Sequence, residues 1–232
     1  MSLFSMLGNP FLYILLLIIV LGVWLFLHRP SPALSILMFE KVGQPSKNST
    51  LKHQWISVKK LNKTLLSLQK RECTFITPKQ LNDSLPPRPV LLAFMGGYRS
   101  FYTTVFPLLQ KYNIPATLFI APDLIGTFNS WQDPYEEPWQ DLLTLEEVNE
   151  LKKSSLIYWG ALPLGGQNIT ACSKEQAVFA IKESIYRLEH QLGISPCAWS
   201  SYPNLKIASA IQQTIEAHAP LLPFLHADVS HN

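Results

Sequence analysis

Short apolar runs alternate with amphipathic stretches along most of this chain. Runs typical of buried strands occur at residues 34–39, 90–94 and 116–120, where apolar residues follow one another with hardly a break. From Ser57 onward the apolar positions recur at helical spacing (Val58, Leu61, Leu65 and Leu68), which predicts an amphipathic helix. This alternation predicts an α/β domain, with a mainly parallel sheet or barrel covered by helices.

The second half of the chain continues the same alternation. Thr144 with Glu147, and Ser173 with Gln176, match the capping box that begins a helix. The pattern predicts short or extended strands at residues 73–76, 156–159, 196–202 and 221–225. It predicts helices at residues 102–112 and 205–218. Sites in such folds lie at the carboxyl ends of the strands, so the residues after each strand are the first candidates for chemistry.

The N-terminal segment has a different pattern. Residues 1–27 carry no charged side chain, and residues 11–27 are continuously apolar. At about 1.5 Å per residue this run approaches the ~30 Å hydrocarbon core of a bilayer. It predicts a transmembrane anchor over residues 1–28, a linker over 29–33 and a domain over 34–232. The alternative is a cleaved signal peptide, which usually has a basic start and a small-residue cleavage site; neither is clear here.

Composition narrows the classes of partner. The formal net charge of +3 comes without a long basic run, which argues against a nucleic acid partner. The three cysteines, Cys73, Cys172 and Cys197, are far apart and form no C-x-x-C pair, so neither a disulfide framework nor a zinc cage is indicated.

The strand predicted at residues 90–94 ends in an unusual way. It leads directly into Met95, Gly96 and Gly97, where an α/β enzyme would place polar or metal-binding side chains. Beyond the next strand, residues 126–139 form a long polar loop. The acidic residues in and beside it (Asp123, Asp133, Glu136, Glu137 and Asp141) are interpreted as a solvated surface, the commoner role of loop acids; the alternative is a metal or sugar site.

Residues 93–98, Ala-Phe-Met-Gly-Gly-Tyr, resemble the first motif of NodB-like polysaccharide deacetylases, usually Thr-Phe-Asp-Asp-Gly-Tyr. The resemblance covers residues 35–203 and is strongest over 90–120. Residues 36–42 are similar to the leading strand of the membrane-associated branch that deacetylates poly-N-acetylglucosamine. The resemblance implies a distorted or truncated (β/α) barrel of the NodB type. It also implies a reaction in which an aspartate and two histidines hold a divalent metal such as zinc, while a second aspartate acts as general base.

Carried onto this chain, the reactive positions of the family hold other residue types. The base position falls on Met95, the metal-binding aspartate on Gly96, and the two metal-binding histidines on Leu162 and Gly166. The histidine of the leading strand becomes Glu40. Thioether, methyl and hydrogen substituents do not replace carboxylate and imidazole ligands. We therefore expect no catalytic residue at these positions, no bound metal and no other cofactor.

Aromatic side chains are the candidates for sugar binding. Tyr98, Trp131, Trp159 and Tyr202 could stack on a polysaccharide, although core packing is the commoner role of such residues. The leading hypothesis is a catalytically degenerate, membrane-anchored protein that binds a cell-envelope polysaccharide or assists its assembly.

Two alternatives stay open. One is an active carbohydrate N-deacetylase with relocated ligands, drawn from Glu40 and the C-terminal histidines His218, His226 and His231. The spacing of these histidines matches no zinc motif, and a solvated tail is the simpler interpretation. The other alternative is a structural partner of another membrane or envelope protein.

The orientation of the anchor is contested by two arguments. Arg29, Lys41 and Lys47 follow the apolar span and no basic residue precedes it, which favours a cytoplasmic domain by the positive-inside rule. The family resemblance implies the opposite, because such deacetylases act on cell-surface polymers. Large domains cross the membrane despite such charges, so we expect a single-pass membrane protein with an extracytoplasmic domain.

Overall fold

The computed structural model describes residues 14–15, 17–22, 33–166, 168–201, 213 and 222–223. The chain divides into two compact units, Met1–Pro32 and Ala33–Asn232. The described residues of the first unit are helical. Among all described residues, no helix combines the length and the apolar composition that crossing a bilayer requires. Most of the predicted anchor and all of the helix predicted at 205–218 except residue 213, which is helical, lie outside the described residues. Tyr202 and the C-terminal histidines also lie outside them.

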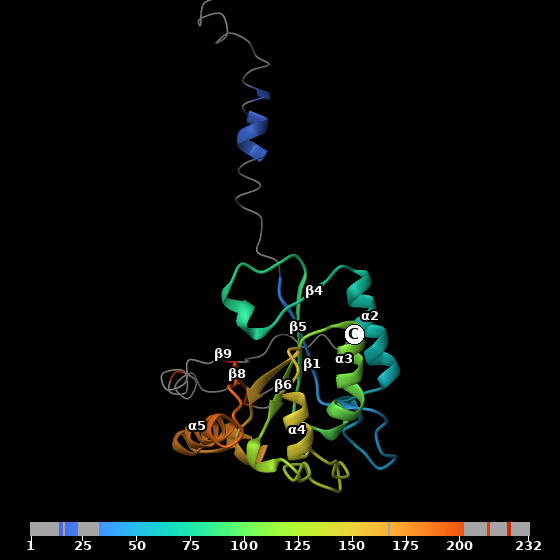
Figure 1. Cartoon of the computed structure of the whole chain (residues 1–232), viewed down its shortest axis with the longest axis vertical. Coiled ribbons are helices and arrows are strands. Elements are labelled where there is room, and N and C mark those ends of the chain that lie inside the picture. Colours follow the sequence, from blue (N-terminus) through green and yellow to red (C-terminus); the bar gives the residue numbers. More distant parts are fainter. Residues whose placement is uncertain are drawn as a thin grey trace, which may run out of the picture. The chain divides into compact units, whose positions relative to one another are not determined.

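The second unit is built on a parallel sheet, seen at the centre of Figure 1. The strand order is β1-β5-β6-β7-β8-β9, with β4 beside the first residues of β5, and each of these pairings is parallel. The strands are β1 (Ser35–Phe39), β4 (Thr74–Phe75), β5 (Pro89–Phe94), β6 (Ala116–Ile120), β7 (Ile157–Ala161), β8 (Ala198–Trp199) and β9 (Leu222–Pro223). A separate parallel pair joins β2 (Lys41–Val42) to β3 (Trp55–Ile56).

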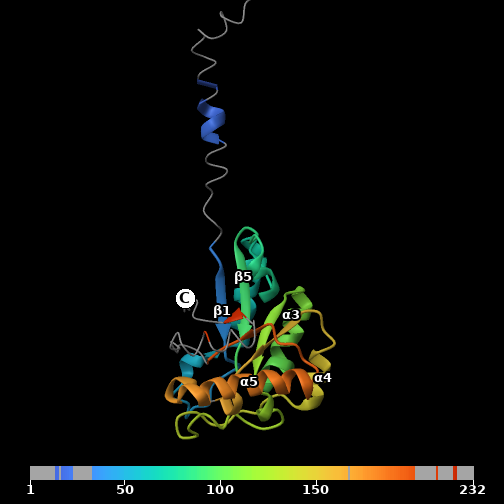
Figure 2. The ribbon, with the colours of Figure 1, turned by 90° about the vertical axis from the view of Figure 1, so that its left-hand side faces the viewer.

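Helices cover one side of this sheet. They are α2 (Val58–Lys70), the π-helix η4 (Phe101–Val105), α3 (Phe106–Tyr112), α4 (Leu145–Leu151) and α5 (Lys174–His190). Short 3₁₀ turns are η2 (Lys52–Gln54), η3 (Pro78–Asn82), η5 (Pro122–Leu124), η6 (Leu164–Gly166) and η7 (Ile169–Ala171). In Figure 1, α2 and α3 lie on one side of β5, whereas α5 lies on the other side, near β8. Figure 2 shows α5 running across the lower part of the unit, where it contacts β7.

The helix ends follow the capping signals in the sequence. The hydroxyl oxygen of Ser57 accepts a hydrogen bond from the Lys60 backbone at 3.2 Å and begins α2. The capping boxes predicted at Thr144 and Ser173 are both present, at the starts of α4 and α5. Each box satisfies backbone N–H groups that have no partner within the helix.

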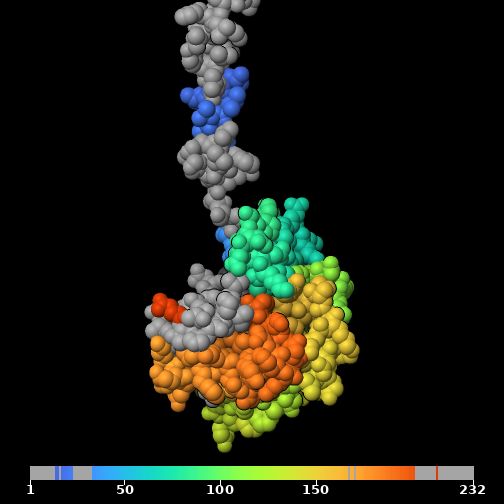
Figure 3. Space-filling view, turned by 60° about the vertical axis from the view of Figure 1, so that its left-hand side comes forward, coloured from blue at the N-terminus to red at the C-terminus, as the bar shows by residue number. Residues whose placement is uncertain are grey.

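The outer face of α5, orange in Figure 3, is exposed and carries Phe179, whose exposed fraction is 63%.

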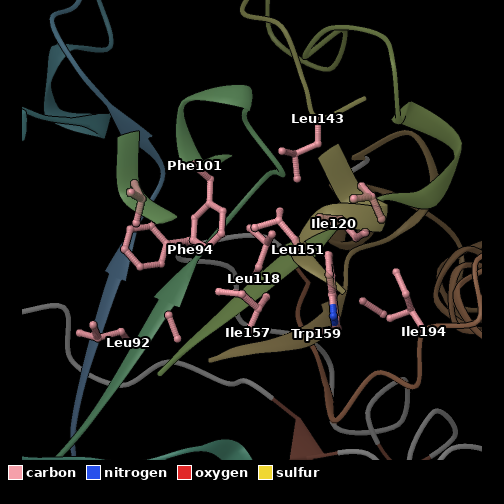
Figure 4. Close-up of a cluster of buried hydrophobic side chains, with 14 of the residues drawn as sticks. Leu92, Phe94, Phe101, Leu118, Ile120, Leu143, Leu151, Ile157, Trp159 and Ile194 are labelled. Carbon is pink, nitrogen blue, oxygen red and sulfur yellow. The ribbon is translucent and has the colours of Figure 1, made fainter. Parts of the chain in front are cut away.

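Alternate residues of β5 face two different apolar clusters, as the two-residue repeat of a strand requires. Val90, Leu92 and Phe94 belong to the helix-side cluster, which contains the buried faces of α2 to α5 and is drawn in part in Figure 4. Leu91, Ala93 and Met95 belong to the opposite cluster, here called the inner cluster. The rest of the inner cluster comes from other strands and strand ends: Ile76, Phe119, Ala121, Leu162 and Ala198.

Candidate functional site

The carboxyl end of β5 is held by hydrogen bonds to both neighbouring strands. The Met95 N–H donates to the Phe39 carbonyl at 2.8 Å, and the Gly96 N–H donates to the Phe119 carbonyl at 3.1 Å. Gly96 then adopts a φ of 95°, which a residue with a side chain rarely takes up. A Cβ atom at Gly96 would lie 2.6 Å from Cε2 of Tyr98. The chain therefore turns away from the sheet along a path that requires glycine at this position.

Met95 and Leu162 follow the carboxyl ends of β5 and β7, and both side chains are buried on the same side of the sheet. Each has an exposed fraction of 1%, and both belong to the inner cluster. Leu162 is placed by a hydrogen bond from its N–H to the Ile120 carbonyl at 2.9 Å, just beyond β7. The position that the resemblance assigns to the base and one position that it assigns to a metal ligand are thus filled by apolar side chains of one buried cluster.

The ring of Trp131 occupies the space that a side chain at position 166 would need. Gly166 has a φ of 61°, and a Cβ atom there would lie 2.6 Å from Cε3 of Trp131. The same indole ring packs against Tyr98, with ring centroids 6.0 Å apart and an interplanar angle of 58°. The structure thus brings Tyr98 and Trp131 together. It places Trp159 elsewhere, in the helix-side cluster with an exposed fraction of 8% (Figure 4).

The residues at these strand ends do not fit the divalent metal that the resemblance implies. Gly96, Leu162 and Gly166 have no oxygen or nitrogen in their side chains, and Zn²⁺ or a similar ion needs such donors or thiolates. Within the part of the chain that the structure describes, no group of three or more His, Cys, Asp and Glu side chains is placed to hold a metal ion.

Glu40 differs from the other predicted positions because its side chain can titrate. It follows β1 directly, and the Phe39 carbonyl beside it accepts the Met95 N–H, so Glu40 lies level with the end of β5. Its Oε2 atom is buried and receives no hydrogen bond from the described residues. Burial raises the pKa of Glu40 to about 7; the Lys41 ammonium opposes this shift and the Glu137 carboxylate adds to it.

Lys41 is a functional candidate that the sequence did not reveal. Its exposed fraction is only 1%, and its ammonium donates to Oε1 of Gln54 at 2.7 Å. The same Nζ lies 3.9 Å from Oε1 of Glu137 and faces the rings of Tyr98 and Trp55, whose centroids are 5.5 and 5.9 Å away. Burial lowers the pKa of Lys41. In the sequence Lys41 is only a charge that follows an apolar span, and nothing in its spacing predicts these partners.

The interpretation of Glu137 as a solvated loop acid was wrong. Its side chain is fully buried and accepts hydrogen bonds from the Ser49 hydroxyl and, at 3.0 Å, from Nε1 of Trp55. A carboxylate is buried at acceptable cost only when it has such partners. The loop that carries Glu137 is therefore docked onto the β2–β3 pair.

The far end of the same loop is tied to the end of β5. The Leu143 N–H donates to the Gly97 carbonyl, and the Arg99 N–H donates to the Asp141 carbonyl, both at 2.9 Å. Nε of Arg99 also donates to Oε1 of Glu147 at 2.8 Å. These bonds fix the loop, and Trp131 within it, over the strand ends.

Comparison with known proteins identifies the family to which this architecture belongs. The family model described as "Polysaccharide deacetylase" matches residues 82–219. The chain belongs to the polysaccharide deacetylase family. Among curated relatives, the poly-beta-1,6-N-acetyl-D-glucosamine N-deacetylase of Escherichia coli (strain K12) is 34% identical over 76 residues, which is 32% of this chain and 11% of that protein. The enzyme of the same name from Staphylococcus aureus (strain MSSA476) is 25% identical over 116 residues, 48% of this chain and 38% of that protein. The matches thus span well under half the length of these relatives.

Solved structures confirm the NodB-type fold of this deacetylase-family chain. IcaB from Ammonifex degensii superposes with a TM-score of 0.67 at 19% identity, covering 80% of each chain. The Streptococcus pyogenes deacetylase PplD, solved with acetate, gives a TM-score of 0.65 at 20% identity and covers 81% of this chain and 80% of that one. The predicted distorted barrel is, more specifically, a curled parallel half-barrel with helices outside.

Proposed function

We propose that this chain is a catalytically degenerate member of the polysaccharide deacetylase family, which binds a cell-envelope polysaccharide or assists its assembly without hydrolysing it. The observation that carries the proposal is the ring of Trp131, which stands where any side chain at Gly166 would have to be. Tyr98 does the same at Gly96. Family-type ligands at these two positions would need space that two packed aromatic rings already fill.

The chemistry of amide hydrolysis supports the same proposal. Removing an N-acetyl group requires a base that activates water and an electrophile that polarises the carbonyl. The residues assigned to these tasks by the resemblance are Met95 for the base and Gly96, Leu162 and Gly166 for the metal. None of them can accept a proton at neutral pH or bind a borderline cation. The chain therefore lacks, at these positions, both the base that would activate water and the ligands for the metal that would polarise the carbonyl.

The polysaccharide is proposed from the relatives. The E. coli and S. aureus proteins are named for poly-beta-1,6-N-acetyl-D-glucosamine, and we propose a polymer of this class as the ligand here. We also propose that residues 1–28 anchor the chain in a membrane, with the domain on the extracytoplasmic side. A reporter fused to the C-terminus tests the orientation: activity of a reporter that works only in the cytoplasm would contradict it.

The decisive experiment uses the full-length chain, purified in mild detergent. Acetate release from a β-1,6-linked N-acetylglucosamine oligomer is measured after addition of zinc, nickel or cobalt, with the E. coli relative as positive control. We expect no release above background, and measurable binding of the same oligomer by calorimetry. Tight stoichiometric metal, or acetate release that a chelator abolishes, would overturn the proposal.

One observation favours a second candidate, an active N-deacetylase with relocated ligands. Glu40 lies level with Met95, and its pKa of about 7 is the value that suits a general base at neutral pH. If this candidate is correct, acetate is released and Glu40→Gln abolishes the release while the fold is retained.

A further inference from the structure

A pocket of about 280 Å³ opens next to Tyr98. No residue at the five predicted reactive positions lines it, since its walls come from the β2–β3 pair, the segment leading into η4 and the end of the long loop. The lining side chains used below are Lys41, Trp55, Tyr98, Arg99, Ser100, Gln140 and Asp141. Known ligand sites typically measure ~300–1,000 Å³, so this pocket suits a single ring-sized group.

One wall of the pocket is aromatic and fixed in place. Trp55 is held by the hydrogen bond from its Nε1 to Oε1 of Glu137 at 3.0 Å, and Tyr98 is buried with an exposed fraction of 3%. Both rings also face the Lys41 ammonium. A fixed aromatic wall offers an apolar surface on which the C–H face of a ring can pack at little entropic cost.

The remaining wall carries polar groups with hydrogen-bonding capacity that the described residues leave open. Within the described residues, the Asp141 carboxylate accepts no hydrogen bond, and the Ser100 hydroxyl, although at the start of η4, caps no backbone N–H. Gln140 donates through Nε2 to the carbonyls of Pro138 and Trp139, which leaves its Oε1 as a spare acceptor. Donors and acceptors that line a pocket without intramolecular partners are suited to a ligand rich in hydroxyl groups.

The two cations that line the pocket, Lys41 and Arg99, are both offset by acidic side chains. Nζ of Lys41 lies 3.9 Å from Oε1 of Glu137. Nε of Arg99 lies 2.8 Å from Oε1 of Glu147, and its guanidinium also interacts electrostatically with Asp141, so each of these two cations already has an acidic neighbour. The surrounding segment is acidic: residues 113–151 contain eight acidic residues and no Lys, Arg or His. This charge balance favours neutral and amine-bearing sugars over phosphate, sulfate and acidic sugars.

We infer that this pocket holds one sugar residue of a neutral or amine-bearing polysaccharide, packed on Trp55 with its hydroxyl groups bonded to Asp141, Ser100 and Gln140. The inference rests on the proposed function and adds to it the place where the polymer is held. That place is beside the strand ends and not over Met95 and Leu162.

The test is calorimetric titration of the full-length chain in mild detergent with a β-1,6-linked N-acetylglucosamine oligomer. Asp141→Asn removes the charged acceptor, and Ser100→Ala removes a hydroxyl that makes no hydrogen bond to the described residues. Loss of a hydrogen bond to a charged group typically weakens binding by about tenfold or more, so Asp141→Asn should raise Kd at least ~10-fold, and Ser100→Ala by ~3- to 10-fold. Thermal unfolding of each variant checks that the fold is retained.

Matched controls separate the possible outcomes. Glu136→Gln and Ser130→Ala change exposed residues of the same loop that do not line the pocket, and Kd should stay unchanged. If the oligomer binds but Asp141→Asn and Ser100→Ala leave Kd unaltered, the pocket is wrong while the proposed function stands. If the unmodified chain binds neither this oligomer nor its de-N-acetylated form, both the pocket and the proposed function are wrong.

Discussion

Cε3 of Trp131 lies 2.6 Å from the point where Gly166 would carry a Cβ atom. Real Cβ contacts are essentially never that short, so the indole ring and any side chain at position 166 exclude each other. Gly166→Ala should therefore destabilise the protein by roughly 2–4 kcal/mol, through steric overlap added to the strain of a positive φ. The free energy of unfolding in urea measures this change.

Gly126→Ala is the matched control for that prediction. Gly126 has a φ of 77°, but an added Cβ there would meet nothing within 4 Å. Its cost should be about 1 kcal/mol, from backbone strain alone. Combining Gly166→Ala with Trp131→Ala should recover part of the loss, because the clashing ring is gone. Equal costs at the two glycines would contradict the account of Trp131.

Restoring an acid at the base position should not restore chemistry. Met95→Asp places a carboxyl group in the inner cluster beside Leu162, where the side chain of residue 95 is 1% exposed. We expect a destabilisation of roughly 2–5 kcal/mol, a pKa raised by burial, and no acetate release. Met95→Leu, which keeps the volume and polarity, should cost less than about 1.5 kcal/mol. Chemical denaturation measures the stability of both variants, and an acetate assay measures their activity. If Met95→Asp were as stable as Met95→Leu, water would have to reach the inner cluster.

The sequence predicted the sheet and its helices well, because their signals are local. The run at β6 was predicted residue for residue, and Thr144 and Ser173 were identified as helix caps from side chains three residues apart. The helix predicted over 102–112 is divided into η4 and α3, beside Pro107, which lacks the N–H that a continuous α-helix would use.

The candidate site was harder to predict because its contacts are distant in sequence. The two-residue strands β2 and β3 are too short to show a periodicity, so nothing indicated that Lys41 would be buried beside Gln54. The bond between Ser49 and Glu137 joins residues 88 positions apart. Composition indicated an acidic loop, but only the fold shows which of its acids turns inward.

The stability of the fold should depend on pH through Glu40. Its folded-state pKa is raised from 4.5 to about 7, first by burial, so the folded protein holds the proton more tightly than the unfolded chain. Stability should therefore fall as pH rises from about 4.5 to 7 and then level off. Glu40→Gln, which stays neutral, should remove this dependence and raise stability at pH 8 by roughly 1–3 kcal/mol. Chemical denaturation at several pH values tests this; an unchanged pH profile in the Gln variant would show that Glu40 is solvated.

Breaking the buried pair of Lys41 and Glu137 should cost more than breaking a surface pair. Lys41→Met leaves the Glu137 carboxylate buried without its cation and deprives Gln54 of a donor, and we expect a loss of roughly 3–5 kcal/mol. Lys153→Met removes the partner of Glu150 in an exposed ion pair and should change stability by less than about 0.5 kcal/mol. In a double-mutant cycle with Glu137→Gln, the buried pair should show a coupling energy above about 1 kcal/mol that persists at high salt, because buried charges are little screened. A coupling energy that vanishes in 1 M salt would mean that water reaches the pair. The aromatic wall formed by Trp55 and Tyr98 would then not be held in place by Glu137 and Lys41.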